Sequence, residues 1–421
     1  MKKHLLALSA AAVLLAPNAV GAEGFSVNEW SAEGFAMGGA RMFAENDAAN
    51  MAYNPASLTK VQGEKAKISV AYIAPHGKWK ADPESATAGF HGITESQSGR
   101  NRVNPAYAPG LYYVKQINDK EWLGMGTYAR FGNMCQFERN DIVASSAFSS
   151  RLNGVSLGMN YARKHDNKWS TSVGAEINYV GLVLDKNLQM VAPLHVKGES
   201  VALGWNAAAN YAFDEKNEFG VVYRSKVKHS MEADYDAHGI AGGVEGDAYG
   251  CVTLPESWML GYGHKFDDKT RMELNATWTR WSRFDALHVG LTPGFNLGPA
   301  PVKELHSDNM WKDGWRYAIG IEHKLSDKYS VMAGIAHDER GIPDEGADFM
   351  VPTGERDTYS IGVQYHDKKQ TVALALGYMD VGDMNMSNHK SASGAPSYAY
   401  NKAKMYDSYT KIVVLSYQYN F

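Results

Sequence analysis

The sequence contains no apolar stretch long enough for a membrane helix once its first residues are set aside. A helix needs about 20 predominantly apolar residues to cross the hydrocarbon core of a bilayer. No run of that length follows Leu15, and the mean hydropathy of the chain is negative. A helical membrane protein is therefore excluded.

The chain also lacks an excess of positive charge, and it has few cysteines. The formal net charge is -4 at pH 7, so the chain offers no basic excess for nucleic acid, and no nucleic-acid partner is expected. The two cysteines, Cys135 and Cys251, are expected in long loops on the outer side. In an oxidising environment they could form a disulfide or remain two unpaired thiols, and the sequence leaves both open.

The first 22 residues have the features of a secretory signal. Lys2 and Lys3 supply the positive end, residues 5–15 the apolar stretch, and Val20-Gly21-Ala22 a small-residue cleavage site. We therefore exclude residues 1–22 from the fold and expect the mature chain to start near Glu23.

Tyrosine and glycine are abundant, with 24 and 41 residues, and six short charged turns divide the chain. The turns are Asn118-Asp119-Lys120, Asp166-Asn167-Lys168, Asp214-Glu215-Lys216-Asn217, Asp267-Asp268-Lys269, Ser326-Asp327-Lys328 and Asp367-Lys368-Lys369. Each lies between segments of alternating apolar and polar residues, which is typical of a hairpin tip. Roughly 40 to 60 residues separate successive tips, enough for two strands of about ten residues and one long loop.

Six hairpins, with one strand before the first and one after the last, give about fourteen strands. The expected fold class is all-β, a 14-stranded antiparallel transmembrane β-barrel of even strand number, as bacterial single-chain barrels require. The expected strands are 66–77, 105–117, 121–132, 151–164, 169–184, 200–213, 218–228, 252–266, 270–284, 315–325, 329–338, 356–366, 370–380 and 411–421. The segments 78–104, 133–150, 185–199, 229–251, 285–314, 339–355 and 381–410 are expected as outer loops.

The last strand carries the alternation most clearly. Val413, Leu415 and Tyr417 lie on one face, and Ile412 and Val414 lie on the other. Its aromatic end at Phe421 resembles the signal by which the outer-membrane assembly machinery recognises its barrels. A soluble sandwich could alternate too, but it would not usually need a dozen hairpin strands with loops so unequal on the two sides.

Residues 23–64 fit no strand. They contain several glycines, a run of alanines and six large apolar residues, which are Phe25, Trp30, Phe35, Met42, Phe43 and Met51. The alternative is a flexible periplasmic tail, but a solvated leader would not carry so many large apolar side chains. The expected organisation is a signal at 1–22, a hatch inside the lumen at 23–64 and a barrel at 65–421.

Short motifs across the mature chain carry a resemblance to a known family. They are Gly24-Phe25-Ser26-Val27-Asn28-Glu29-Trp30, Asn54-Pro55-Ala56, Leu254-Pro255-Glu256-Ser257-Trp258, residues 278–285 (WTRWSRFD), residues 311–317 (WKDGWRY), Gly341-Ile342-Pro343-Asp344, residues 352–356 and Tyr359-Ser360-Ile361-Gly362. In this order they resemble the FadL family of outer-membrane long-chain fatty acid and hydrocarbon transporters.

The resemblance implies a monomeric barrel in which a hydrophobic molecule binds from outside and leaves sideways into the membrane. In that family the opening lies at an inward kink of the third strand, which the Asn54-Pro55-Ala56 segment would approach. Here the kink would fall near Phe131 and Gly132, since glycine tolerates unusual backbone angles. Phe25 occupies the position of a binding-pocket aromatic. It could equally be a residue that only packs the plug, and Asn-Pro could be an ordinary turn.

Two arginines are candidate partners for a carboxylate headgroup. Arg316 falls on the inward face by alternation, toward Glu322 or lumen water, and Arg356 fits the family's twelfth-strand pattern. For both, the alternative is pairing with other inward charges or with the plug. Trp278, Trp281, Trp311 and Trp315 are expected to form an aromatic girdle near the outer strand ends. Neither catalytic residues, metal ligands nor a cofactor are expected, because no acid, histidine or nucleophile arrangement converges.

The expected function is outer-membrane transport of a fatty acid or related hydrocarbon. A general diffusion porin is the first alternative, and the apolar plug argues against it. A surface receptor or adhesin acting through the long loops is a second alternative, and it could coexist with transport. An enzyme built on a barrel is a third. The expected partners are a hydrophobic small molecule, outer-membrane lipids with lipopolysaccharide, and the barrel assembly machinery.

Overall fold

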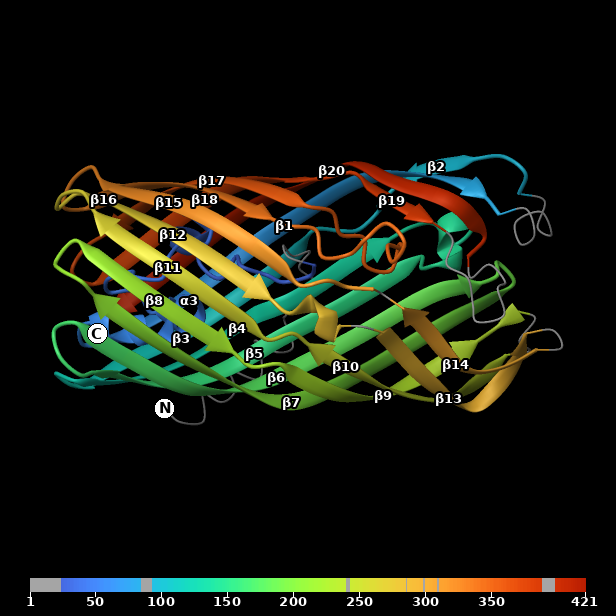
Figure 1. The fold of residues 1–421 in the computed structure, drawn as a ribbon, viewed down its shortest axis with the longest axis horizontal. Helices are drawn as coiled ribbons and strands as arrows, with labels where there is room; N and C mark the ends of the chain where they lie inside the picture. The colour runs from blue at the N-terminus through green and yellow to red at the C-terminus, as the bar shows by residue number, and fades with distance from the viewer. Residues whose placement is uncertain are drawn as a thin grey trace.

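The computed structural model describes residues 24–84, 93–239, 243–284, 286–297, 300–308, 310–387 and 398–421. They form one closed antiparallel sheet of fourteen wall strands, seen in Figure 1 as a long barrel of tilted strands. The predicted fold class is confirmed. The predicted signal at residues 1–22 lies outside the described residues, so it stays a prediction.

The wall is built from strands that follow one another around the barrel. In chain order they are β1 (Glu64–Pro83), β3 (Ala106–Asn118), β4 (Glu121–Gln136), β5 (Ser149–Lys164), β6 (Trp169–Leu188), β7 (Ala192–Ala212), β8 (Asn217–Arg224) with β9 (Val227–Ala237), β10 (Val244–Leu254) with β11 (Ser257–Lys265), β12 (Thr270–Thr279), β15 (Gly314–Lys324), β16 (Tyr329–Asp338), β17 (Arg356–His366), β18 (Gln370–Val381) and β20 (Tyr400–Asn420). Pairing of β1 with β20, from Lys65 opposite Asn420 onward, closes the sheet.

Shorter elements lie at the loop end. They are β2 (Gln97–Arg100), η3 (Ile142–Ser145), η5 (Trp281–Arg283), β13 (Ala286–Leu297), β14 (Ala300–Asp308) and β19 (Met384–Ser387). Three of the segments expected as outer loops, 185–199, 229–251 and 285–314, are instead largely strand, because hairpins of the sheet continue past the apolar belt with a polar outer face. The expected loop positions were therefore partly wrong.

All six predicted turns are present and lie together at the left end of Figure 1. In five of them the first residue uses its side-chain oxygen to accept the main-chain N–H groups two and three positions later. The five are Asp166, Asp214, Asp267, Ser326 and Asp367. Asn118 accepts from Lys120 alone. These local bonds explain why Asp, Asn or Ser begins each turn.

The outer face of the barrel is apolar, and residues of the two faces alternate along each strand. In the last strand Val413, Leu415 and Tyr417 are exposed, whereas Ile412 and Val414 are buried, as predicted. Exposed aromatic side chains gather near the turn end, with Trp169, Phe213, Phe266, Tyr329, Tyr419 and Phe421, and again further out, with Trp205, Trp258, Tyr317, Tyr359 and Tyr378. Two aromatic bands around an apolar belt are typical of a membrane barrel. No helix among the described residues is long and apolar enough to span a membrane.

The segment before β1 folds inside the barrel as two short helices and a 3-10 turn, which are α2 (Ala32–Ala36), α3 (Asn50–Tyr53) and η1 (Pro55–Lys60). We call residues 24–63 the hatch. Ser31 caps α2 by accepting the N–H of Gly34 at 3.0 Å. The helix packs directly on β16, where a Cβ at Gly334 would collide with the main chain of Met37 and Gly38. Glycine on the wall therefore permits this close approach.

The contribution of the side-chain bonds in the turns can be tested at Asp267, because the neighbouring Asp268 offers a matched control. Main-chain N–H groups of Lys269 and Thr270 hold the pKa of Asp267 below its usual value. A carboxylate whose pKa is lower in the folded than in the unfolded state stabilises the fold at pH values above its unfolded pKa of about 3.9. That contribution to stability is lost as the pH falls through the folded pKa. We expect Asp267→Ala to lower the urea midpoint of unfolding at pH 7, and the difference from wild type to shrink as the pH falls below about 4.

The matched control is Asp268→Ala, which removes an adjacent exposed carboxylate from the same turn. Equal midpoints for the two variants at pH 7 would contradict the turn argument.

Candidate functional site

The third wall strand, β4, carries an irregularity beside an interrupted pairing. Its register with β5 runs to Ala129 opposite Val155 and resumes at Phe131 opposite Gly154, so Arg130 is an extra residue. On the other side β3 pairs with β4 only as far as Leu111 opposite Thr127. Residues 106–110 of β3 pair with β1 but have no partner on β4. The wall therefore has a gap between β3 and β4 at the bulge.

The hatch supplies main-chain partners at this gap. The N–H of Val27 donates to the carbonyl of Arg130 at 2.9 Å, and the N–H of Gly132 donates to the carbonyl of Phe25 at 2.8 Å. The indole Nε1 of Trp30 donates to the carbonyl of Ala129 at 2.6 Å. The first residues of the hatch thus stand in for the missing strand, from inside the lumen.

The irregularity lies at Arg130, directly before Phe131 and Gly132, near which the sequence put the kink. Gly132 pairs regularly with Asn153, whereas Arg130 carries the bulge. The Asn54-Pro55-Ala56 turn makes its hydrogen bonds to β7 and within the hatch, not to the bulge on β4. The Asn54 Nδ2 donates to Asn210 on β7 at 2.7 Å, and its Oδ1 caps η1 by accepting the N–H of Ala56. The hatch segment that bonds to the bulge is therefore residues 25–30.

Phe25 lies inside a cage of aromatic rings. Its ring meets four others edge to face, at centroid distances of 5.9 Å to Phe131, 4.7 Å to Trp281, 5.0 Å to Phe284 and 5.9 Å to Trp311. Such contacts stabilise aromatic pairs beyond the burial of their area.

Two tryptophans that the sequence assigned to the girdle belong to this cage instead. Trp281 and Trp311 are only 1% and 4% exposed. They close over Gly24, where φ is +63° and a Cβ would lie 2.8 Å from Trp281. Their prediction as girdle residues was wrong, because η5 turns Trp281 inward just after β12 ends.

Beyond the cage, toward the loop end, the interior is apolar. One contiguous buried cluster joins Phe25 and Phe131 to side chains of β5, β6, β7, β9, β10 and the loop around residues 342–350. His229 on β9 is a polar exception with no exposed surface; the main chain of Ser200 lies near its ring, but neither ring nitrogen has a well-formed hydrogen bond in the described part of the chain. A buried polar group without a partner is rare and costs about 1–3 kcal/mol.

On the other side of the bulge the interior is charged. The buried carboxylate of Glu176 accepts from Arg130 at 3.0 Å and from Arg224 at 2.6 Å. Arg224 also donates to the carbonyl of Ala52 in the hatch and, at 2.9 Å, to the hydroxyl of Tyr128. One carboxylate thereby links the bulge to the hatch.

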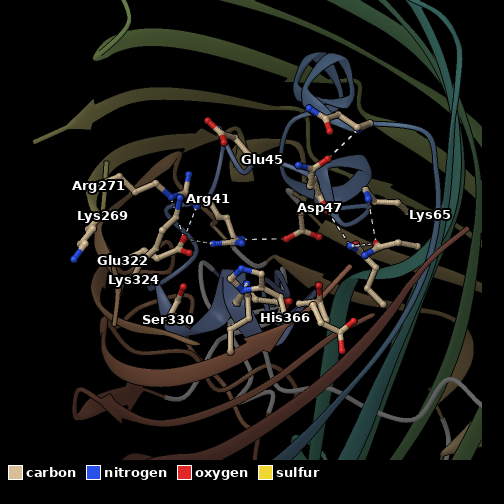
Figure 2. Close-up of a pocket in the computed structure, with 18 of the residues that line it drawn as sticks. Arg41, Glu45, Asp47, Lys65, Lys269, Arg271, Glu322, Lys324, Ser330 and His366 are labelled. Atoms are coloured by element: carbon tan, nitrogen blue, oxygen red, sulfur yellow. Dashed lines mark hydrogen bonds and ion pairs between the residues drawn. The ribbon is translucent and has the colours of Figure 1, made fainter. Parts of the chain in front are cut away.

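The hatch is fixed at the turn end by a second charged cluster, shown in Figure 2. Arg41 lies between Asp47 and Glu322, at 3.1 Å from each, and Lys67 on β1 contacts Glu33 at 2.8 Å and Asp47 at 2.7 Å. Burial opposes ionisation of Asp47, but Lys67 and Arg41 outweigh it and hold its pKa below the usual range. The polar cavity beside these groups has a volume of about 580 Å³.

The two candidate headgroup arginines bind the hatch as well. Arg316 donates to the carbonyl of Gly38 at 2.6 Å and lies 3.0 Å from Asp338, rather than facing Glu322. Arg356 donates to the carbonyl of Gly24 at 2.8 Å. Both contacts match the structural alternative, in which inward charges pair with each other or with the plug. Of the eight predicted site residues, the structure brings together Phe25, Phe131, Gly132 and Arg356 around Gly24.

The two cysteines are not bonded to each other. Cys135 is buried on β4, where its Sγ lies 2.9 Å from the carbonyl of Phe349, and Cys251 is exposed on β10. A disulfide between them is absent from the structure.

The charged anchor of the hatch can be tested at Lys67. Lys67→Met would leave the buried carboxylates of Glu33 and Asp47 without their shared cation, and breaking a buried ion pair in this way costs about 3–5 kcal/mol. We expect faster hydrogen exchange of the α2 and α3 amides than in wild type. Lys65→Met is the control, because Lys65 contacts the neutral amide of Asn420 at 3.1 Å. Equal exchange in the two variants would contradict this role.

Comparison with known proteins gives a consistent result along the chain. The family model described as outer membrane protein transport protein (OMPP1/FadL/TodX) matches residues 13–421. The long-chain fatty acid transport protein of Escherichia coli K12 is 24% identical over 422 residues, covering 89% of this chain and 91% of that protein. Outer membrane protein P1 of Haemophilus influenzae is 25% identical over 470 residues, covering 100% of both.

Solved structures share the fold. A FadL homologue of Pseudomonas aeruginosa has a TM-score of 0.82 at 18% identity and covers 94% of this chain and 100% of that one. The toluene transporter TodX of P. putida has a TM-score of 0.71 at 16% identity, with 94% and 99% covered. From the match along the chain, it belongs to the outer-membrane transport protein family of OMPP1, FadL and TodX, and is a multi-pass protein of the bacterial outer membrane.

Proposed function

We propose that this protein carries hydrophobic molecules, of the fatty acid or hydrocarbon class, from outside the cell into the outer membrane through the gap between β3 and β4. The observation that carries the proposal is the bulge at Arg130, where hatch residues replace a neighbouring strand. The relatives named for fatty acid and toluene transport support the substrate class.

The driving force for entry is burial of the apolar part of the molecule. Each methylene gains about 0.8 kcal/mol on leaving water, and the interior beyond the cage is one apolar cluster that reaches Phe25 and Phe131. Transfer from there into lipid exchanges one apolar environment for another. The step needs no bond making, so the proposal assigns no catalytic residue and no cofactor.

The direction of exit follows from what surrounds the cage. Toward the turn end a hydrophobic molecule would meet the Glu176 and Arg41 ion pairs. Displacing such buried pairs costs several kcal/mol per ion. Sideways, the obstacle is the first stretch of the hatch, held to β4 by three hydrogen bonds.

The alternatives explain fewer of these features. A diffusion porin for polar solutes would not need an apolar outer lumen with a hatch fixed by buried ion pairs. A receptor or adhesin role would use the outer hairpins and would leave the gap without a purpose. A monomeric state and recognition of Phe421 by the assembly machinery stay predictions, as does contact with lipopolysaccharide.

We further propose that His229 meets the polar end of a fatty acid. A buried imidazole without a partner can donate one hydrogen bond, and a carboxylate or carboxylic acid would supply the missing acceptor. A hydrocarbon has no such end, so this residue would distinguish the two substrate classes.

Deletion of Arg130 tests the lateral route. Removing the extra residue should let β4 keep a regular register with β5 and bring the rest of the strand into line with β3. We expect uptake of radiolabelled long-chain fatty acid and of toluene, in a strain lacking other such transporters, to fall at least tenfold, or about 1.4 kcal/mol in the barrier.

Arg130→Ala is the matched control, because it removes the contact with Glu176 while keeping the bulge. Heat-modifiable mobility on gels verifies that both variants are folded. Wild-type uptake by the folded deletion variant would overturn the lateral route, whichever hydrophobic molecule is transported.

His229→Leu separates headgroup recognition from a packing role. The substitution removes an unpaired buried group, so the free energy of unfolding should be unchanged or higher. Binding of a spin-labelled fatty acid should weaken, whereas toluene uptake should stay at the wild-type level. A loss of stability with equal effects on both ligands would contradict the assignment and leave His229 a packing residue.

A further inference from the structure

Three strands at the loop end bring potential metal ligands onto one face. β13 lies between β10 and β14, pairing with β10 up to Gly250 opposite Val289 and with β14 at His288 opposite His306. These hairpins extend from the right-hand end of the barrel in Figure 1, opposite to the turns. His288 and His306 are both exposed, whereas Val289, the residue after His288, points inward and is 6% exposed.

The two imidazole rings are already at ligand spacing. Their Nδ1 atoms lie 2.9 Å apart and their ring centroids 4.1 Å apart. Two nitrogens that each lie about 2.0–2.1 Å from one metal ion, at about 90–110° to each other, are themselves separated by about 2.9–3.4 Å. Without a metal, one Nδ1–H donates to the other Nδ1. With a metal, the donor ring would move its proton to Nε2, where the acceptor ring already carries its own, and both Nδ1 lone pairs would face the ion.

Neighbouring side chains extend the set of donors. Glu304 is exposed on β14, two residues from His306 and therefore on the same face. Cys251 is exposed on β10, one residue past the last β10–β13 pair and thus beside the strand position of His288. Among the described residues no three such side chains lie close enough to hold an ion together. The two histidines are the preformed ligands, and water would fill the remaining coordination positions of the ion.

We propose that His288 and His306 form a binding site for a divalent transition metal ion of the Cu²⁺ or Zn²⁺ type on the outer surface. Imidazole nitrogens prefer these ions to Mg²⁺ or Ca²⁺. Because β13 is held by a strand on each side, the ligands keep their spacing without help from the metal. The site lies on different elements from β3, β4 and the hatch, so it stands or falls independently of the proposed transport.

The test uses the full-length protein without a polyhistidine tag, stripped with chelator and titrated with ZnCl₂ or CuCl₂ by calorimetry in detergent. We expect one ion per chain, with Cu²⁺ bound more tightly than Zn²⁺ and both more tightly than Mn²⁺. His288→Gln and His306→Gln should each weaken binding at least about tenfold, the loss that even an outer-shell change commonly produces. The electron paramagnetic resonance spectrum of bound Cu²⁺ should show nitrogen ligands in the wild-type protein.

His323→Gln is the control. His323 is an exposed histidine at the turn end, next to Thr270, and its replacement should leave binding unchanged. Cys251→Ser should also keep the ion, because the pair supplies the anchoring ligands. Equal affinity in wild type, His288→Gln and His306→Gln would overturn the proposal. So would binding that disappears in Cys251→Ser but survives in His288→Gln.

Discussion

Main-chain hydrogen bonding in a lipid environment is the constraint on which this structure depends. Every strand that faces lipid must find partners on both edges, since lipid offers none, and closure of β1 on β20 meets that demand. The exception is the edge between β3 and β4 above Thr127. There the hatch supplies partners to β4 through Phe25, Val27 and Trp30. The gap and the hatch are therefore linked, because the edge that β4 leaves free beside β3 is bonded by the hatch.

Much of the fold could be predicted because its determinants are local. An aspartate or serine that bonds its own turn can be recognised within four residues, and strand faces can be read from a period of two. The hairpins formed by β9, β10, β13 and β14 were missed for a physical reason. Past the apolar belt these strands keep an apolar inner face, but their outer face is polar, with Lys228, Glu232 and Asp234 exposed on β9. Such charged segments resemble loops.

The site was less predictable because its contacts join distant parts of the chain. Arg130 reads as one residue of a regular strand, and its partner Glu176 lies 46 positions later. Trp281 and Trp311 stand near strand ends, where a girdle is the usual explanation, and only the path of η5 turns Trp281 toward Phe25. The resemblance put the kink near Phe131 and Gly132, next to the bulge at Arg130, but it brought Asn54-Pro55-Ala56 to the kink, whereas the hatch residues bonded there are 25–30.

Glu176 links the bulge on β4 to the hatch. It has no exposed surface, and its two oxygens are divided between Arg130 on the bulge and Arg224, which also holds the hatch at Ala52. Two guanidinium groups that share one carboxylate in a low-dielectric interior cannot separate from it independently without leaving a charge unpaired. A displacement of the hatch that pulls Arg224 would therefore also strain the contact that fixes the bulge. The same ion cluster that blocks a hydrophobic molecule from the turn end thus ties the position of the hatch to the shape of the gap.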